Sequence, residues 1–371
     1  MQETIWINAC EASGDMHGAA LMAELLEMRP GLSFEGVGGP AMAAAGQEQV
    51  YTMADLSLVG VTEVLASLPR ILGMFRTIKQ RLKERPPKAL VLIDAPDFNF
   101  RLARMAHGLG IPVYYYISPQ VWAWRSGRVK FLERYCRKVL CILPFEKDFY
   151  ASRGVDVEYV GHPLLDLLPL GDAEADVAGH DPKRIGILPG SRRKEIARLL
   201  PRFASTAEIL HQVRPDLRFS LVRAPGVTRE KLAALWPSAV PVEYVAPEER
   251  YQAMGDCALI LASSGTATLE AALLGTPCIV AYRMSFFTAL LAWFFVHVSH
   301  ISLPNLILNK RVFPELIQYK AHESRMLAWA RRWLDEPDAL AEVRSELVRL
   351  RRIMGGPGAA RRAASLILDS L

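Results

Sequence analysis

The sequence predicts an α/β protein in which two successive series of strands and helices each build a parallel sheet. Short apolar runs alternate with helix-forming stretches, and most of these runs end in a tight turn of small or polar residues. The chain has 371 residues, enough for two domains with a core each. We place the first domain at 1–167, a Gly-, Ala- and Asp-rich linker at 168–182, the second domain at 183–345 and a basic helical tail at 346–371.

The composition narrows the classes of function. Hydrophobic residues make up 51% and charged residues 22%, as in a globular protein, and the net charge of +5 suits anionic substrates or an anionic membrane. A nucleic-acid binder would show a larger positive charge and a recognisable binding module, so we expect no nucleic-acid partner. The five cysteines form no C-x-x-C pair and read as reduced cytosolic thiols. The chain lacks D-x-D and H-E-x-x-H motifs and a signal-peptide pattern, so we expect no dedicated metal site and no export.

The second domain contains the clearest strand–turn–helix unit, at residues 257–283. A strand at 257–262 leads through Ser264, Gly265 and Thr266 into a helix that Gly275 ends, and a second strand follows at 278–282. The uncovered N–H groups at such a helix start favour phosphate, and Glu270, one turn further, is placed to accept ribose hydroxyls. The alternative is that Ser264 or Thr266 only caps the helix and that Glu270 is a first-turn acid.

A second phosphate candidate follows the strand at 184–188. The turn from Pro189 to Glu195 combines a glycine with Arg192 and Arg193 at a helix start. Arginine makes bidentate contacts with phosphate.

The first domain has two comparable turns. A strand at 4–9 enters the turn Glu11-Ala12-Ser13-Gly14-Asp15, and a strand at 88–93 opens into Asp94-Ala95-Pro96-Asp97. Acids at the carboxyl ends of buried strands are well placed for chemistry, although capping explains them equally. A loop at 118–125 adds two tryptophans, a glutamine and an arginine that suit contacts with a sugar or an acyl chain, or simple loop packing.

Two further segments bear on partners. Residues 61–84 form a basic amphipathic helix pattern that predicts contact with anionic membrane lipids or, alternatively, an ordinary helix facing the core. The membrane-contact residues predicted there are Leu68, Ile71, Leu72, Phe75, Arg76 and Lys79. The uncharged stretch at 284–298 is too short for a comfortable membrane span and predicts burial or a contact with a second copy in a homodimer.

Eight turns taken in order resemble one known family. They are Glu11–Asp15, Gly36–Pro40, Ile93–Asn99, Ser118–Trp124, Gly161–Pro163, Leu188–Arg192, Ser263–Pro277 and Ser302–Asn305. Over nearly its whole length the chain is similar to the lipid-A-disaccharide synthase family. That family commonly has glycine before the first turn, where this chain has Cys10.

The resemblance implies a GT-B glycosyltransferase, with two Rossmann-like domains facing each other across a cleft. It implies transfer of 2,3-diacylglucosamine from its UDP derivative to the 6-hydroxyl of 2,3-diacylglucosamine 1-phosphate, with inversion and without a metal or other cofactor. It also implies a cytoplasmic protein that is peripheral on the inner face of the inner membrane. The rival within the same fold is a UDP-sugar epimerase.

Matching motif positions assign the roles. Asp97 is the predicted general base, with Asp94 as the alternative, and Arg192 stabilises the departing diphosphate. The predicted UDP-binding set is Arg192, Ser264, Gly265, Thr266 and Glu270, and the predicted acceptor-side set is Glu11, Ser13, Gly14, His17 and Asp94.

Overall fold

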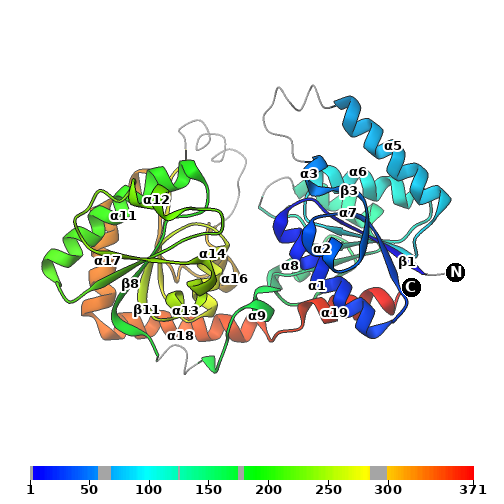
Figure 1. Cartoon of the computed structure of the whole chain (residues 1–371). Coiled ribbons are helices and arrows are strands. Elements are labelled where there is room, and N and C mark those ends of the chain that lie inside the picture. Colours follow the sequence, from blue (N-terminus) through cyan, green and yellow to red (C-terminus); the bar gives the residue numbers. More distant parts are fainter. Residues whose placement is uncertain (1–2, 57–67, 124–125, 174–178, 285–298) are drawn as a thin grey trace. The chain divides into compact units, whose positions relative to one another are not determined.

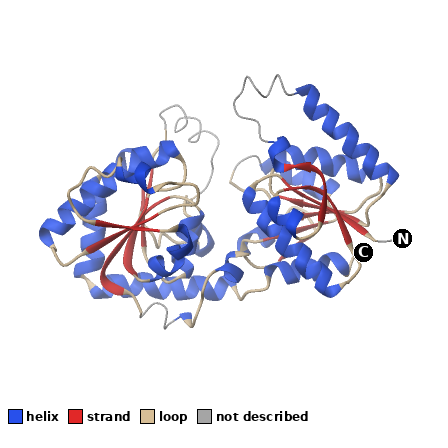
Figure 2. Ribbon diagram, in the orientation of Figure 1, coloured by secondary structure: helices blue, strands red, loops and turns tan. Residues whose placement is uncertain are grey.

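The computed structural model describes residues 3–56, 68–123, 126–173, 179–284 and 299–371. The chain forms two compact units (Figure 1). Unit 1 comprises Met1–Asp166 together with Gly356–Leu371, and unit 2 comprises Leu167–Gly355. Each unit is built on its own parallel sheet, with helices on both faces (Figure 2).

The sheet of unit 1 has seven strands in the order β3-β2-β1-β4-β5-β6-β7. Along β4, Leu90 and Leu92 enter one core cluster while Val91 and Ile93 enter the other, on the opposite face. Burial on both faces explains why this strand is a continuous apolar run in the sequence. The strands are β1 (Thr4–Ala9), β2 (Ser33–Gly38), β3 (Gln47–Thr52), β4 (Ala89–Ile93), β5 (Val113–Tyr116), β6 (Lys138–Cys141) and β7 (Val157–Tyr159).

The helices of unit 1 cover both faces of this sheet. On one face α1 packs beside α19, and Leu21 and Leu25 share a core cluster with Ala363 and Ile367. The described helices are α1 (Ala12–Met28), α2 (Pro40–Ala44), α3 (Met53–Leu56), α5 (Leu68–Glu84), α6 (Pro96–His107), α7 (Val129–Tyr135), α8 (Pro144–Ala151), α19 (Ala359–Leu368) and the 3-10 turn η1 (Ser126–Arg128), with α9 (Leu164–Leu167) at the change to unit 2.

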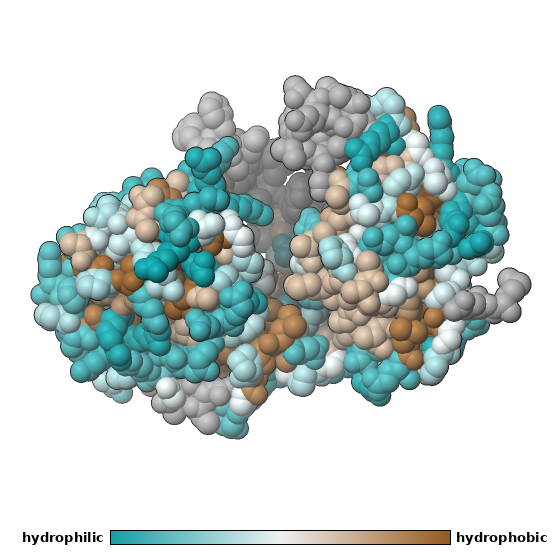
Figure 3. All heavy atoms as spheres, in the orientation of Figure 1, coloured by the Kyte–Doolittle hydropathy of each residue, from teal (hydrophilic) through white to brown (hydrophobic). Residues whose placement is uncertain are grey.

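Asp15 joins α1 to the turn that follows β2. Its buried carboxylate accepts backbone N–H groups from Gly39 at 2.7 Å, Ala41 at 2.9 Å and Met42 at 3.1 Å. These contacts satisfy the start of α2, so Asp15 has a structural role within the first turn motif. Figure 3 shows weakly hydrophobic surface where α1 and α2 lie.

The sheet of unit 2 has six strands in the order β10-β9-β8-β11-β12-β13. Its central strand β11 is buried along its whole length. The strands are β8 (Asp181–Leu188), β9 (Arg218–Val222), β10 (Val242–Val245), β11 (Cys257–Ser263), β12 (Cys278–Tyr282) and β13 (Glu315–Ile317). The described helices are α11 (Arg193–Val213), α12 (Arg229–Ala233), α13 (Arg250–Gly255), α14 (Thr266–Leu273), α16 (Leu303–Leu308), α17 (Glu323–Asp335), α18 (Pro337–Met354) and the 3-10 turns η2 (Pro247–Glu249) and η3 (Gln318–Lys320).

The division of the chain differs from the predicted linker and tail. Helix α18 runs without a break across the predicted boundary at 345, because Leu347, Leu350 and Met354 are buried in unit 2. The chain then passes into α19, which belongs to unit 1. The predicted tail 346–371 is therefore shared between the units, and the change occurs at the glycine-rich stretch 355–358.

In each sheet, successive strands are added first toward one edge and then toward the other. The point where this direction changes is the expected position of the candidate site. In unit 1 the reversal lies between β1 and β4, and in unit 2 it lies between β8 and β11. Ligands of open α/β sheets bind at the carboxyl ends of the strands at such a switch point. Among the described helices, none combines the length and the apolar character that crossing a membrane requires.

Candidate active site

The switch point of unit 1 brings the two predicted turns together. Ala9 at the end of β1 pairs with Ile93 at the end of β4, so the Glu11–Asp15 and Asp94–Asp97 turns leave the sheet side by side. A Cβ on Gly14 would lie 3.3 Å from the Ala9 Cβ, which shows how closely α1 starts against the strands. Cys10 stands between strand and turn, and burial raises the pKa of its thiol to about 12.

The backbone of the second turn is held in a strained conformation. Asp94 and Ala95 have φ values of 50° and 42°, in the left-handed region that non-glycine residues rarely adopt. The Asp94 carbonyl oxygen accepts hydrogen bonds from the Tyr115 hydroxyl at 2.6 Å and from Asn99 Nδ2 at 2.7 Å. Asn99 Oδ1 in turn accepts from Asn8 Nδ2 of β1 at 2.6 Å. Strain of this kind persists only where surrounding contacts enforce it, and it is frequent at functional sites.

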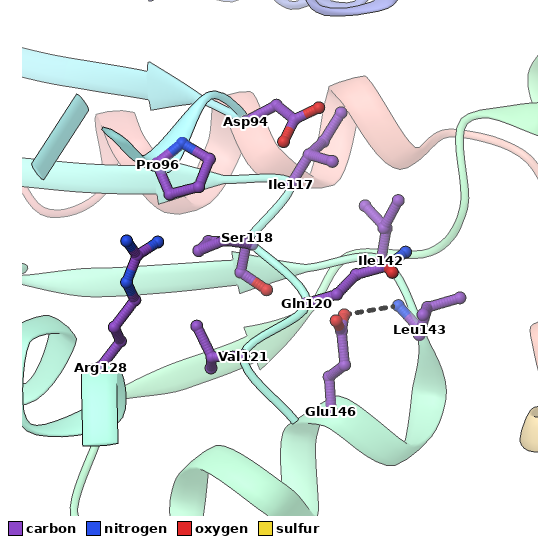
Figure 4. A pocket seen from close by; sticks show the side chains of 11 residues that line it. Asp94, Pro96, Ile117, Ser118, Gln120, Val121, Arg128, Ile142, Leu143 and Glu146 are labelled. Carbon is purple, nitrogen blue, oxygen red and sulfur yellow. Dashed lines mark hydrogen bonds between the residues drawn. The ribbon is translucent and has the colours of Figure 1, made fainter. Parts of the chain in front are cut away.

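A pocket of about 300 Å³ opens beside this turn (Figure 4). Its walls come from the carboxyl ends of β4, β5 and β6 and from the loops and helices that follow them. Ser118 at the wall is buried beside Glu146 and Tyr150. The lining residues are Asp94, Pro96, Ile117, Ser118, Pro119, Gln120, Val121, Arg128, Ile142, Leu143 and Glu146.

The two aspartates of the turn have different surroundings. Asp94 lines the pocket, and burial raises the pKa of its carboxyl group above the ordinary value. Asp97, in the first turn of α6, has a side chain that is 83% exposed and accepts a charge-assisted hydrogen bond from Arg128 Nη2 at 2.7 Å. Arg128 also lies over the Phe100 ring. The pocket lining therefore includes a partly buried acid, Asp94, and the guanidinium of Arg128, which pairs with the exposed Asp97 outside the lining.

Glu146 is a buried acid that the sequence motifs do not indicate. Its carboxylate accepts the Leu143 backbone N–H at 3.1 Å and the Trp122 indole N–H at 2.9 Å. Burial raises the pKa of Glu146 to about 7, although these hydrogen bonds act in the opposite direction. Trp122 also packs edge-on against Phe145, so loop packing accounts for Trp122, while Trp124 and Arg125 lie outside the described residues.

The remaining predicted acceptor-side residues lie on or before α1. Glu11 and Ser13 are exposed at its start, and Gly14 is buried against the strands. His17 is half-buried, and burial lowers its pKa. Burial and nearby His17 lower the pKa of His162 to about 4, so both imidazoles are neutral at pH 7. His162 belongs to a motif in the sequence, but its proximity to His17 is evident only in the fold.

The switch point of unit 2 brings together the two predicted phosphate turns. Leu188 at the end of β8 pairs with Ala262 of β11, so the turns ending in Arg192 and Thr266 leave neighbouring strands. The carboxylate of Glu195 accepts backbone N–H groups of Ser191 and Arg192 and covers Gly190, whose φ is 101°. Glu195 thus accepts the first free backbone N–H groups at the start of α11, and the side chains of Arg192 and Arg193 are exposed and available to a ligand.

Neither Ser264 nor Thr266 is the N-cap residue of α14, so the capping alternative does not hold for this turn. The residue at the N-cap of α14 is Gly265, which has no side chain to cap with. Ser264 Oγ instead donates to the Ile301 carbonyl oxygen at 3.3 Å, and Thr266 is exposed. The start of α14 therefore lacks a side-chain cap from its N-cap residue.

Glu270 lies one turn into α14 beside two residues that the sequence motifs do not indicate. Burial raises the pKa of its half-buried carboxyl group, while Arg250 and Tyr251 of α13 lower it. Arg250 Nη2 donates to the Tyr251 hydroxyl at 2.6 Å. A carboxylate, a phenol and a guanidinium at this position suit the hydroxyl groups of a sugar.

The Ser302–Asn305 motif anchors the neighbouring loop. Glu315 at the start of β13 accepts hydrogen bonds from the Ser302 backbone N–H and hydroxyl and from Asn305 Nδ2, at 2.8 to 2.9 Å. Asn305 Oδ1 accepts from the backbone N–H groups of Val312 and Phe313. These contacts hold the segment against which Ser264 is bonded.

The predicted membrane segment is only partly described, because residues 57–67 and the Leu68 side chain lie outside the described part of the chain. On α5, Leu72, Arg76 and Lys79 are exposed and Ile71 is half-buried. Phe75 lies on the side of α5 that faces the core. It is buried, and its ring stacks on the Phe98 ring with the two centroids 4.7 Å apart. The prediction that Phe75 contacts lipid is therefore wrong.

The predicted apolar stretch 284–298 is described only at Met284, so burial or a dimer contact there stays a prediction. Across the ranges that the structure describes, no group of three or more His, Cys, Asp or Glu side chains could hold a metal ion.

Several known proteins resemble the chain in sequence over nearly its whole length. A family model described as lipid-A-disaccharide synthetase matches residues 5–362. The chain is 41% identical over 372 residues to the lipid-A-disaccharide synthase of Geobacter sulfurreducens, covering 99% of this chain and 97% of that protein. The enzyme of the same name from Geobacter metallireducens is also 41% identical over 372 residues, with the same coverage.

Solved structures share the fold at low identity. UDP-GlcNAc 2-epimerase from Neisseria meningitidis, solved with UDP-GlcNAc, has a TM-score of 0.65 and 12% identity, and MurG from Acinetobacter baumannii has a TM-score of 0.63 and 14% identity. Both matches cover 100% of each chain. Two parallel-sheet α/β domains of this kind form the GT-B fold, and the fold alone does not separate a transferase from an epimerase.

The burial of Glu146 makes a pH-dependent contribution to stability. The pKa is about 7 in the folded protein against 4.5 ordinarily, so the unfolded chain releases this proton first. The contribution is complete below about pH 4.5 and is lost as the pH rises to about 7. Relative to Glu146→Gln, the parent should be more stable at pH 5 than at pH 8 by roughly 2–3 kcal/mol. Urea unfolding at both pH values measures this difference, with Glu133→Gln as the exposed control; equal differences at both pH values would contradict it.

Proposed function

Since this chain belongs to the lipid-A-disaccharide synthase family, we propose that it transfers 2,3-diacylglucosamine from its UDP derivative to 2,3-diacylglucosamine 1-phosphate. The chain is a glycosyltransferase of GT-B fold that acts in lipid A biosynthesis. The product is the β-1,6-linked tetraacyl disaccharide 1-phosphate, and UDP is released. The single observation that carries the proposal is the 41% identity over 99% of the chain. The acids at the switch point of unit 1 and the arginine at the switch point of unit 2 are consistent with it.

We place the acceptor in unit 1 and the nucleotide of the donor in unit 2. The pocket beside Asp94 offers hydroxyl, amide and guanidinium groups, which suit an amino sugar that carries a phosphate. In unit 2 the exposed Arg192 and the start of α14 are suited to the diphosphate. Glu270 is suited to accept the two ribose hydroxyls, with Tyr251 and Arg250 beside it.

The reaction requires one bond to form as another breaks. The acceptor 6-hydroxyl oxygen attacks C1 of the donor sugar on the face opposite the diphosphate, which inverts the configuration. The carboxylate of Asp97 takes the hydroxyl proton, and the C1–O bond to the diphosphate breaks. Arg192 and the N–H groups at the start of α14 stabilise the charge that develops on UDP. The ion pair with Arg128 orients the Asp97 carboxylate for this step.

The assignment of Asp97 predicts a loss of turnover on its replacement. Asp97→Asn removes the proton acceptor but keeps the shape, so kcat should fall about 10²–10⁴-fold, the usual contribution of a general base. Disaccharide formation from purified substrates measures the rate, with Asp94→Asn as the matched variant.

Comparing Asp97→Asn with Asp94→Asn identifies which aspartate is the general base. If Asp97→Asn kept a rate within about threefold of the parent and Asp94→Asn lost it, Asp94 would be the base. The raised pKa of Asp94 would then move the acidic limb of the pH–rate profile above the ordinary range of an aspartate.

The assignment of Arg192 to the diphosphate and of Glu270 to the ribose predicts that their variants differ in how they bind UDP and pyrophosphate. Arg192→Ala should weaken binding of UDP and pyrophosphate alike, because a charge-assisted hydrogen bond contributes roughly 1.5–3 kcal/mol. Glu270→Gln should weaken UDP but leave pyrophosphate nearly unchanged, since the carboxylate is assigned to the ribose. Titration calorimetry with both ligands measures this, and equal losses for Glu270→Gln would assign Glu270 to the architecture of α14 instead.

Both proposed substrates carry acyl chains, so we propose a peripheral contact with anionic lipids on the inner face of the inner membrane. The exposed Leu72, Arg76 and Lys79 of α5 support this surface. Arg81 is excluded from it, because Arg81 pairs with Glu35 at 2.8 Å and also with Glu48.

Reversing the charges of this surface should release the protein from vesicles. Arg76→Glu with Lys79→Glu should lower sedimentation with anionic vesicles at low salt, since each cation near such a surface contributes about 1 kcal/mol and salt screens it. The control is Arg229→Glu with Lys231→Glu, an equal change of charge on exposed residues of α12. Sedimentation of the α5 variant at the level of the parent would exclude this surface.

A further inference from the structure

Three of the five non-glycine residues with positive φ in the described part of the chain lie at or beside the pocket of unit 1. Asp94 and Ile117 line this pocket, and Ala95 stands between Asp94 and Pro96 (Figure 4). The φ of Ile117 is 59°, which makes it an outlier for a β-branched residue. Backbone of this kind persists only where surrounding contacts enforce it, so strain is concentrated at one wall of the pocket.

The residues that follow Asp94 do little to stabilise the turn. Ala95 is the N-cap residue of α6, with a φ of 42°, a ψ of 60° and no side-chain hydrogen bond to the helix. An N-cap residue is ordinarily extended and carries an oxygen that accepts a helix N–H group. Pro96 fits the first helical position but has no backbone N–H to contribute. The conformation of the turn must therefore be held from outside it.

Three buried side chains from neighbouring elements hold the turn, and we call them the clamp: Asn8 of β1, Asn99 of α6 and Tyr115 of β5. Two of them donate to the Asp94 carbonyl oxygen, Tyr115 at 2.6 Å and Asn99 at 2.7 Å. Asn99 Nδ2 also donates to the Ile93 carbonyl oxygen at 3.0 Å, and its Oδ1 accepts from Asn8 at 2.6 Å. Burial raises the pKa of the Tyr115 hydroxyl well above its ordinary value, so this group remains a donor. The clamp therefore fixes the peptide plane between Asp94 and Ala95.

Both candidate bases depend on this peptide. The Asp94 side chain leaves the chain just before it and lines the pocket, and Asp97 follows it in the first turn of α6. Asp97 Oδ1 accepts from Arg128 Nη2 at 2.7 Å. A return to ordinary backbone angles would redirect both carboxyl groups, and a shift of about 1 Å at a reacting group can cost about 10²-fold in rate. The clamp is thus placed to affect turnover whichever aspartate takes the proton.

We propose that Tyr115 and Asn99 are positioning residues for the glycosyl transfer. They hold the Asp94 carbonyl, and with it the left-handed turn from which Asp94 and Asp97 face the acceptor. Asn8 keeps the Asn99 amide oriented so that its Nδ2 points to the turn. This inference rests on the proposed function, because it concerns the geometry of that reaction, but it does not depend on the choice between the two aspartates.

Replacing Tyr115 by phenylalanine removes one bond to the turn and leaves the ring in the core. Tyr115→Phe should lower kcat about tenfold or more through misplacement of the base. The KM for the UDP-linked donor and the affinity for UDP should stay within about twofold of the parent, since their binding is assigned to unit 2. The matched control is Tyr114→Phe, which should keep the kcat of the parent. Tyr114 is equally buried on the opposite face of the sheet, and its hydroxyl is bonded to Ser370 Oγ at 2.7 Å.

Two further measurements separate positioning from a general loss of stability. Hydrogen–deuterium exchange reports on the Asn99 backbone N–H, which donates to the Ala95 carbonyl oxygen at 3.0 Å and closes the first turn of α6. Exchange there should be faster in Tyr115→Phe than in the parent or in Tyr114→Phe. Adding Ala95→Gly to Tyr115→Phe should raise kcat again by about threefold or more, because glycine takes a positive φ without the strain that alanine bears.

The proposal fails if Tyr115→Phe keeps the kcat of the parent, or if Tyr114→Phe loses as much. It also fails if Ala95→Gly restores nothing to the Tyr115→Phe variant, since the hydroxyl would then not serve to hold the strained turn. Asn99→Ala, which removes the other bond to the Asp94 carbonyl, replaces Tyr115→Phe if the melting temperature shows that variant to be unfolded. A parent that forms no disaccharide would refute the proposed function, and the exchange comparison would then still decide whether the clamp holds the turn.

Discussion

The parallel pairing of β1 with β4, and of β8 with β11, is the constraint on which the candidate site depends. In each sheet this pair stands where the strand order reverses, so the chain leaves the two strands toward helices on opposite faces. The turns that follow are thereby set beside each other although about 80 residues separate them in the chain. Acidic side chains lie at the ends of β1 and β4 in unit 1. Arg192 and the uncapped start of α14 lie at the ends of β8 and β11 in unit 2.

The site in unit 1 stores unfavourable energy that the rest of the unit offsets. Two consecutive non-glycine residues take left-handed backbone conformations, and two carboxyl groups have pKa values raised by burial. Hydrogen bonds from Tyr115 and Asn99 hold the turn, and Trp122 holds Glu146. A rigid, partly dehydrated wall strengthens every polar contact that a sugar makes with it. Burial of the apolar side chains on both sides of β4 offsets the free-energy cost of this arrangement.

The sequence was sufficient where a physical signal is local. Strands such as β4 and β11 are apolar on both faces, and their ends were predicted within one or two residues. The edge strands β3 and β13 were not predicted, because β3 is largely polar and β13 has only three residues. Glu146, Arg128, Arg250 and Tyr251 were also missed. They reach the sites from neighbouring helices and turns, and nothing in their local pattern distinguishes them from surface charges. Asp97 and Arg192 were assigned from a family resemblance, and the fold shows only that each lies at a switch point.

The placement of α19 has a consequence for how the protein is made. Ala363, Ala364 and Ile367 complete a core whose other members include Ile5, Ile7 and Leu21, more than 300 residues earlier in the chain. On the ribosome, unit 2 is a continuous segment and can fold as soon as it has emerged. Unit 1 is synthesised first, yet α19, which completes one of its two core clusters, is made only after the whole of unit 2. During that interval the apolar side chains that α19 covers are open to water, so the first unit to be translated is the last to be finished.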